Sequence, residues 1–556
     1  MVNVLLKMVS HLPIKPVDFI VFRFESLFRC FIIDANSWRP HLLVLFETCS
    51  RMVVRNYNSI MALSPQKELT ENDLKRGLNM VIWDGLASEV VISLTGGAFL
   101  VAMALLMGAN NIQIGLLASL PMVTNVFQLL SIVLVRKYQN RRLISVVCIA
   151  LARLPLIVIG LWVLLSQGGG SMDMLILFLF FHFFFSSVSG LSWNSWMKDM
   201  IPERMLGEYF SKRSRYTQTL NVALSIMLAL LLDFVRMRYP AYELSTFAIF
   251  FVVAGLVGVV GAYLLSRAPE PQSYMSSARL LTLLKLPLKN ANFRRLLVFN
   301  SAWVFALNIA TPFFTVFMLQ GMGLPLSYII VLTIISQLAS IMTLRMWGAF
   351  SDRYSNKSII SLSAPLYILC LLAWSFVGIY SRLYVNLGLL VLIHMVSGVA
   401  TAGINLSLTN IGLKLAPKED AIVYLSVKNM VTAVFSAIGP LVGGLLADYF
   451  ADKTLEITIG WDSPHFEKVL RLVSLHQWSF LFLIGAFLAL CALELLGRVK
   501  ETGEVEKDVV RRIMRTRLKS SMKDAIIIGN LITWNHQLRA ILKLRKKKRP
   551  AAASDA

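Results

Sequence analysis

The chain has 556 residues, 56% of them hydrophobic, and its mean hydropathy is +0.67. One soluble core of this length does not need so much apolar surface, so the composition excludes an ordinary soluble protein and indicates a membrane protein. The formal net charge of +23 would also suit a nucleic-acid partner, and the positions of the lysines and arginines decide between these interpretations.

Residues 1–60 have mixed polarity and lack both an apolar run of membrane-spanning length and a clear helical period. We predict a poorly structured extension here, and a mature protein that begins at Met61. After it, Thr70-x-x-Asp73 resembles a capping box and predicts the start of a short amphipathic helix towards Trp83.

Twelve apolar stretches follow, each near the length of about 20 residues that crosses a hydrocarbon core. Barrel strands would be about half as long, so the pattern predicts an all-α integral membrane protein with twelve transmembrane helices. The predicted spans are residues 86–107, 111–135, 143–166, 173–197, 214–235, 245–266, 296–320, 325–347, 358–380, 384–413, 421–449 and 475–498.

The basic residues alternate between loops. Most lie in the loops after the second, fourth, sixth, eighth and tenth spans, while the other loops hold few. By the positive-inside rule this places both termini in the cytoplasm and predicts a multi-pass protein of the plasma membrane. The basic tail, residues 499–556, is then expected to lie on anionic lipid headgroups, and no nucleic-acid partner is needed.

Short motifs recur at a nearly constant spacing. The loop Lys137-Tyr138-Gln139-Asn140-Arg141 is echoed by Arg353-Tyr354-Ser355-Asn356-Lys357. Further matches share the spacing from Pro202 to Pro417, here called the repeat offset. At this offset Tyr209, Ser211, Arg213 and Asp233 match Tyr424, Ser426, Lys428 and Asp448. The repeat predicts two pseudo-symmetric six-helix bundles, residues 61–266 and 295–498, joined by a cytoplasmic linker over 267–294.

The segment that begins at Gly348 reads G-x-x-S-D-R-x-x-x-K and ends at Lys357. With the topology and the repeat, it resembles the loop signature of the major facilitator superfamily. The resemblance implies that Asp352 and Arg353 help to hold the cytoplasmic side closed in the outward-facing state. A glycine such as Gly348 is expected where two helices meet closely. The first-half copy has Val135-Arg136 in place of Ser351-Asp352, so its cations Arg136, Lys137, Arg141 and Arg142 are expected to set orientation.

Small residues and a proline mark the eleventh span, in Gly439-Pro440-x-x-Gly443-Gly444. Small residues allow close helix contact, and proline frees backbone groups for bending. In the drug/proton antiporter branch of the superfamily a similar motif lies in the fifth span, where Leu224 to Ala229 here lack both residue types. This difference argues against drug efflux.

Glu89 and Arg153 are ionisable residues that lie inside predicted spans, where a charge is costly and usually functional. An arginine in the middle of a span needs an ion pair or an anionic ligand, and Glu89 is the expected partner. A desolvated glutamate is also a candidate proton carrier. A purely structural pair is the alternative.

Further polar and aromatic side chains in the spans are candidates for a solute cavity or a proton relay. His182 and His394 lie at nearly equivalent positions of the repeat. The other candidates, for each of which interhelical packing is the alternative, are Asn125, Trp193, Asn194, Trp303, Asn308, Gln337, Asn405 and Asn410.

The five cysteines are scattered, and the sequence shows no metal-ligand spacing, nucleophile elbow or Walker motif. We therefore expect no cofactor, no bound metal and no catalysis. The predicted function is secondary active transport of a small solute by alternating access, coupled to protons and carried out by a monomer in the lipid bilayer. A polytopic membrane enzyme and a ligand-sensing homologue that does not transport are the alternatives.

Overall fold

The structure is a computed structural model that describes residues 65–66, 70–166, 171–272, 280–353, 355–378, 383–417, 421–463, 466–475 and 477–501. Within these ranges, 12 helical segments are long and apolar enough to cross a membrane, as the sequence predicts. The predicted extension over residues 1–60 and nearly all of the basic tail lie outside the described residues.

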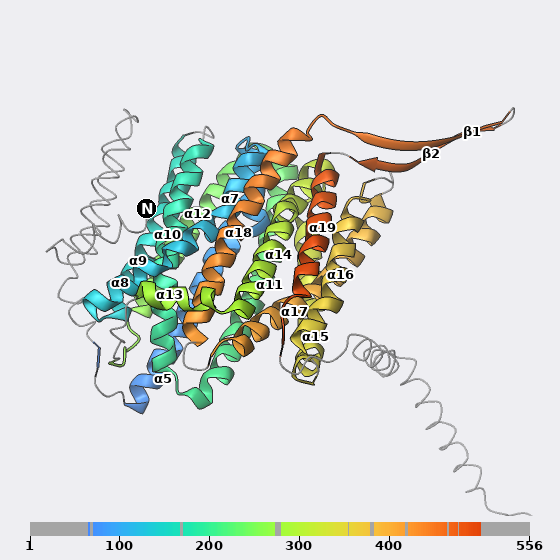
Figure 1. Ribbon diagram of the computed structural model, residues 1–556. Helices are drawn as coiled ribbons and strands as arrows, with labels where there is room; N and C mark the ends of the chain where they lie inside the picture. Colours follow the sequence, from blue (N-terminus) through green and yellow to red (C-terminus); the bar gives the residue numbers. More distant parts are fainter. Residues whose placement is uncertain are drawn as a thin grey trace, which may run out of the picture.

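The first six-helix bundle, coloured from blue to green in Figure 1, begins with a helix that is broken in two. Its helices are α5 (Glu71–Thr95) with α6 (Gly97–Leu106), α7 (Asn111–Thr124) with η2 (Asn125–Phe127) and α8 (Gln128–Tyr138), α9 (Arg141–Leu165), α10 (Met172–Met200), α11 (Glu203–Arg238), η3 (Pro240–Tyr242) and α12 (Glu243–Leu265).

The second bundle follows a linker that contains a short helix, α13 (Leu280–Lys289). Its helices are α14 (Ala291–Val316) with η4 (Phe317–Gly321), α15 (Leu326–Arg353), α16 (Asn356–Trp374), α17 (Leu383–Leu415), α18 (Ala421–Tyr449) and α19 (Gln477–Leu496). An antiparallel hairpin of β1 (Leu455–Ser463) and β2 (Phe466–Leu475) separates α18 from α19 and extends away from the helices (Figure 1).

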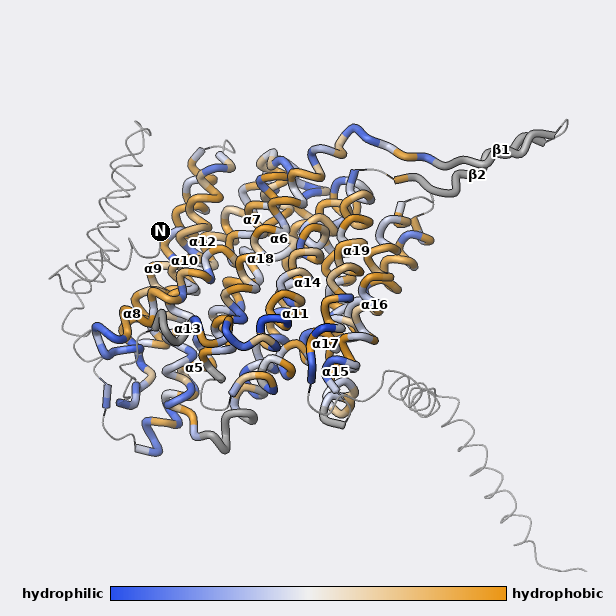
Figure 2. The backbone as a smooth tube through the Cα atoms, in the orientation of Figure 1, coloured by the Kyte–Doolittle hydropathy of each residue, from blue (hydrophilic) through white to orange (hydrophobic). Residues whose placement is uncertain are grey.

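The ends of the bundle are named here by these connections. The linker end is where α12 ends and α9 begins, and the hairpin end is where α18 ends at the β-hairpin. Hydrophobic residues dominate the helices, and hydrophilic residues gather towards the linker end and along the start of the hairpin (Figure 2). Apolar side chains also cover the outside, including Met342, which is 80% exposed, as a lipid environment requires.

Two helices are interrupted inside the bundle. The first breaks between α5 and α6, where Gly97 has a φ of +56°, a conformation that favours glycine. The second changes to the 3-10 turn η2 shortly after Pro121, which cannot donate a backbone hydrogen bond. Discontinuous helices are typical of transporter binding regions, because they free backbone polar groups inside the membrane.

The start of the linker is packed against the first bundle. Ala268 is 0% exposed and Glu270 is 2% exposed, and the Trp196 indole N–H donates to the Pro269 carbonyl at 2.9 Å. The first residues of the predicted linker are therefore fixed against the first bundle.

Candidate functional site

A buried carboxylate, Asp84 of α5, lies near two arginines in the first bundle. It interacts electrostatically with Arg213 of α11 and Arg153 of α9, and only 3% of its surface is exposed. Arg153 also donates to the Ser88 hydroxyl at 3.4 Å. Three helices thus bring two cations to one anion, and the cations offset part of the cost of its burial.

Glycines make room for these side chains. A Cβ added at Gly258 of α12 would lie 2.6 Å from Cδ of Arg153, and one at Gly85 would lie 2.7 Å from Nε of Arg213. Both distances are shorter than real Cβ contacts, so a larger residue at either position would force the arginine side chain to move. The two arginine side chains are therefore closely packed against glycines of α12 and α5.

Glu89, on another face of α5, contacts α11 further along that helix. Its carboxylate accepts a hydrogen bond from Asn221 of α11 at 2.8 Å, and the same amide donates to Ser93 at 3.1 Å. The expected pairing of Glu89 with Arg153 is therefore wrong, because Asp84 is the carboxylate that lies near Arg153. The spacing of Asp84 and Glu89 along α5 places them about 140° apart around the helix.

The two candidate histidines have unlike surroundings. His182 is buried, and its Nδ1 lies 2.7 Å from the Ala152 carbonyl of α9. His394 is partly exposed, and its Nδ1 lies 2.8 Å from the Leu390 carbonyl of its own helix. At the repeat offset the position equivalent to His182 is Ser397, so the two histidines are not equivalent.

The remaining candidates fall into two groups. Trp193, Asn194, Gln337 and Asn405 are partly or fully exposed, and Asn125 lies in the 3-10 turn η2. The other three are in packing contacts: Trp303 is 1% exposed, Asn308 donates to the Val304 carbonyl at 2.7 Å, and Asn410 donates to the Ser351 hydroxyl at 3.0 Å.

In the loop signature, the glycine does not mark a close helix contact. A Cβ added at Gly348 would meet only Leu406, at 4.0 Å, which is an ordinary distance. The expectation of a close approach there is wrong for this conformation. The side chains of Asp352 and Arg353 lie outside the described residues, and the role expected of them stays a prediction.

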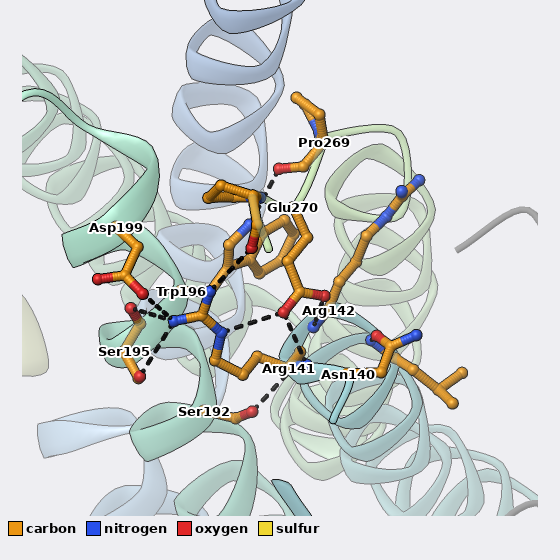
Figure 3. A network of polar contacts seen from close by, with 11 residues as sticks. Asn140, Arg141, Arg142, Ser192, Ser195, Trp196, Asp199, Pro269 and Glu270 are labelled. Carbon is orange, nitrogen blue, oxygen red and sulfur yellow. Dashed lines mark hydrogen bonds and ion pairs between the residues drawn. The ribbon is translucent and has the colours of Figure 1, made fainter. Parts of the chain in front are cut away.

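At the linker end, a carboxylate that follows α12 binds the start of α9 (Figure 3). Glu270 accepts hydrogen bonds from the backbone N–H of Arg141 at 2.9 Å and from that of Arg142 at 3.0 Å. It also pairs with Nε of Arg141 at 3.0 Å, while Nη1 of the same side chain pairs with Asp199 of α10. Arg141 is 2% exposed and Arg142 is 8% exposed, so these cations are structural, and a role in orientation alone is wrong.

The second bundle repeats this arrangement around Glu501, which follows α19. Glu501 accepts from the backbone N–H of Lys357 at 2.8 Å, from the Ser355 hydroxyl at 2.8 Å and from Lys414 at 3.2 Å. Burial raises the pKa of this carboxyl, but the hydrogen bonds from Lys357, Asn356, Ser355 and Lys414 outweigh burial and hold the pKa below its ordinary value.

Sequence reasoning missed both glutamates, although a signal was present. Each stands in R-x-x-E just after the sixth helix of its bundle, Arg267 to Glu270 and Arg498 to Glu501. Their spacing is longer than the repeat offset, because the β-hairpin is inserted before α19 in the second bundle only. A search at constant spacing therefore passes over them.

The two bundles touch at the hairpin end. Asn111, at the start of α7, donates to Asp448 of α18 at 2.7 Å. Asp233 of α11 accepts from the backbone N–H groups of Leu326 at 3.1 Å and Ser327 at 3.0 Å, at the start of α15. Both carboxylates thus contact the first turn of a helix in the other bundle, where a negative charge is favourable.

Glycines bring the same helices together. A Cβ added at Gly115 of α7 would lie 2.3 Å from the Pro440 carbonyl, and one at Gly444 of α18 would lie 2.6 Å from the Asn111 carbonyl. Gly443 packs in the same way on Ile309 of α14. The close helix contact predicted for the glycine-proline motif is confirmed, and part of it lies between the bundles.

Within the described residues, no group of three or more His, Cys, Asp or Glu is placed to hold a metal ion. The polar groups described above are of two kinds: a charged cluster inside the first bundle, and contacts at both ends that fix helices to one another. Such an arrangement suits binding and conformational change.

Comparisons with known proteins agree with this architecture. No curated protein matches the chain significantly. Among solved structures, the nucleoside transporter NupG aligns with 14% identity and a TM-score of 0.54, over 77% of this chain and 98% of that chain. An auto-inhibited POT family peptide transporter has 12% identity and a TM-score of 0.54, over 77% and 98%. The xylose transporter XylE from E. coli, in an inward open conformation, has 11% identity and a TM-score of 0.52, over 79% and 98%.

At such low sequence identities these structural similarities show the fold alone. The assignment to a family comes from the sequence. Residues 86–421 match the family model described as Major Facilitator Superfamily. The match covers more than half of the chain and includes helices of both bundles. The chain therefore belongs to the Major Facilitator Superfamily of transporters.

Proposed function

We propose that this transporter moves a small solute by alternating access and that its present conformation is closed at the hairpin end and open at the linker end. The observation that supports the proposal is that the contacts between the two bundles lie at the hairpin end. The main contacts of the first bundle with α15 and α18 come from α6, α7, η2 and α11, and both cross-bundle carboxylates lie at the hairpin end.

We propose further that the linker end faces the cytoplasm of a cell whose plasma membrane holds the protein. The basic residues of the loops at this end support that orientation through the positive-inside rule. Both termini would then be cytoplasmic, and the present conformation would be open to the cytoplasm.

The coupling ion in this proposal is a proton carried by Glu89. Its carboxylate is partly exposed, is held by the single amide of Asn221, and lies about two helical turns before the break at Gly97. His182 suits the role less well, because it is buried and its Nδ1 is already in contact with a backbone carbonyl.

Reconstitution tests the coupling. Solutes that raise the melting temperature of the purified protein, from a panel of sugars, nucleosides, amino acids, peptides and organic anions, are offered to proteoliposomes with and without a pH gradient. We expect accumulation that requires the gradient in the wild type and is lost in Glu89→Gln, while counterflow exchange persists. Asp173→Asn, an exposed carboxylate at the start of α10, is the matched control.

Two outcomes would contradict the proposal in different ways. Uptake that ignores the gradient would indicate a uniporter. Binding without accumulation or exchange would favour a sensor that uses the transporter fold.

A further inference from the structure

Arg213 of α11 is held in place by two other helices of the first bundle. Its guanidinium lies 5.1 Å from the centre of the Trp193 ring of α10, and its Nε and Nη2 lie against Gly85 of α5. A cation in contact with an indole face is attracted by the ring electrons. The position of the guanidinium is thus defined by packing and not by an acceptor.

Within the described part of the chain, Arg213 makes no hydrogen bond and no ion pair. Its Nε and the Trp193 indole Nε1 are both buried donors without a partner. Arginine offers five N–H donors and indole one, and a buried donor that is left unsatisfied is costly. Arg213 and Trp193 therefore have N–H groups that are free to bind an acceptor, next to the positive charge of the guanidinium.

The second bundle shows the same position in a satisfied form. At the repeat offset, Lys428 corresponds to Arg213 and Leu408 to Trp193, and Nζ of Lys428 donates to the Leu408 carbonyl at 2.8 Å. The repeat thus places a cation next to the fourth helix in both bundles. In the second bundle the backbone carbonyl at this position accepts a hydrogen bond from the cation, whereas in the first bundle Arg213 lies over the indole ring of Trp193 and donates no hydrogen bond within the described residues.

The charges around Arg213 do not supply a dedicated partner. Asp84 is shared with Arg153, and Glu89 interacts with Arg213 electrostatically while its hydrogen bond comes from Asn221. With Glu89 ionised the four charged groups sum to zero, and with Glu89 protonated they leave one positive charge. Tyr209 also faces the cluster, and because burial raises its pKa, it stays neutral.

We infer that the solute of this transporter is a small organic anion whose carboxylate or phosphate group binds Arg213 and the Trp193 indole N–H. The inference rests on the proposed function, since it names the substrate class of the same cluster. The bound anion replaces Glu89 as the counter-charge of Arg213, so that Glu89 takes up a proton when the solute binds. Among the described residues, the groups that face Glu89 are Asn221 and Arg213. Arg213 in turn faces Asp84 and Tyr209, and Asp84 faces Arg153, while α12 contributes glycines to this cluster.

Thermal-shift measurements with matched compounds test the binding site. The pairs differ in charge: benzoate with benzamide, gluconate with glucose, glucose 6-phosphate with glucose, and uridine monophosphate with uridine. We expect at least one anion to raise the melting temperature while its neutral partner does not. Ligand stabilisation follows the ratio of concentration to Kd, so the titration also gives the affinity.

Variants test whether anion binding depends on Arg213. Arg213→Gln should weaken anion binding at least about tenfold, because a charged hydrogen bond is lost. Arg215→Gln removes the same charge from a nearby exposed position and should leave binding unchanged. Wild-type affinity should rise as the pH falls from 8 to 6, and Glu89→Gln should remove that dependence. The carboxylate and phosphate pairs distinguish the two anion chemistries.

Stabilisation by neutral partners alone, by none of these compounds, or equally in Arg213→Gln would overturn the anion site. Uptake into proteoliposomes is scored separately. An anion that binds through Arg213 but is neither accumulated nor exchanged leaves the site standing and overturns the proposed transport. Accumulation of a neutral solute that Arg213→Gln does not change overturns the anion site alone.

Discussion

Asp233 and Asp448 occupy equivalent positions of the repeat, and each carboxylate contacts the first turn of a helix in the opposite bundle. Asp233 meets Leu326 at the start of α15, and Asp448 meets Asn111 at the start of α7. Asn111 and Leu326 are themselves separated by the repeat offset. The hairpin end is thus closed by one contact that the repeat makes twice, and moving the bundles apart at this end must break both copies.

Replacing these aspartates should open the hairpin end. A carboxylate at a helix N-terminus contributes about 1 kcal/mol, so Asp233→Ala and Asp448→Ala should each shift the closed-to-open ratio about fivefold. The double variant should shift it about thirtyfold if the sites are independent. Spin labels at Leu165→Cys and Leu383→Cys, exposed residues near this end in different bundles, report the distance.

The control for this experiment is Asp173→Ala, an exposed acid in the first turn of α10. It should leave the distance distribution as in the wild type. An unchanged distribution in the double aspartate variant would mean that the carboxylates do not hold this end closed.

The glycine contact between α7 and α18 should act in the same direction. Gly444→Ala places a methyl group 2.6 Å from the Asn111 carbonyl, so α7 and α18 must separate. Alanine in place of glycine ordinarily favours a helix by about 1 kcal/mol, so any opening has to come from the cross-bundle clash. Gly190→Ala, where nothing lies within 4 Å, is the matched control and should not open this end.

The sequence was sufficient to predict the twelve spans, because hydrophobic length is a local property. It also predicted the close contact around Gly443 and Gly444, because several small residues close together in a membrane-spanning helix are typical of a close helix contact. The pairing of Arg153 could not be predicted, since Asp84 and Glu89 are both near in sequence and the rotation of α5 selects between them. That rotation is set by the packing of α5 on α11 and α12, which no local pattern encodes.

The linker-end contacts show the same limit. Arg141 and Arg142 look like topology-setting cations because their partner Glu270 is distant in the sequence. Only the folded bundle brings α12 back beside the start of α9. The repeat offset does relate Asp199 to Lys414, one acidic and one basic. Asp199 pairs with Arg141 in the first bundle, and Lys414 pairs with Glu501 in the second.

Loss of Glu270 should destabilise the first bundle strongly. Glu270→Ala leaves the Arg141 side chain, which is 3% exposed, with only Asp199 as a charged partner. Removing one member of a buried pair typically costs about 3 to 5 kcal/mol. Asp199→Asn should cost below about 1 kcal/mol, because the Asp199 side chain is 38% exposed and water screens its pair. Chemical denaturation of the two variants in detergent measures the difference.

Acid should weaken the second bundle through Glu501. Its pKa in the folded protein lies below the ordinary value of 4.5, because the hydrogen bonds from Lys357, Asn356 and Ser355 favour the carboxylate despite burial. A depressed pKa stabilises the fold fully above the unfolded value, and this contribution is lost as the pH falls through the folded pKa. The melting temperature of the wild type should therefore decrease on acidification from about pH 5.

Glu501→Gln isolates this effect. The variant should melt at a lower temperature at neutral pH, and its melting temperature should fall less on acidification than that of the wild type. Lys414→Met is the comparison, because the Lys414 side chain is 45% exposed and supplies only one of the hydrogen bonds. Parallel acid profiles for the wild type and Glu501→Gln would show that another carboxylate controls the stability of this bundle in acid.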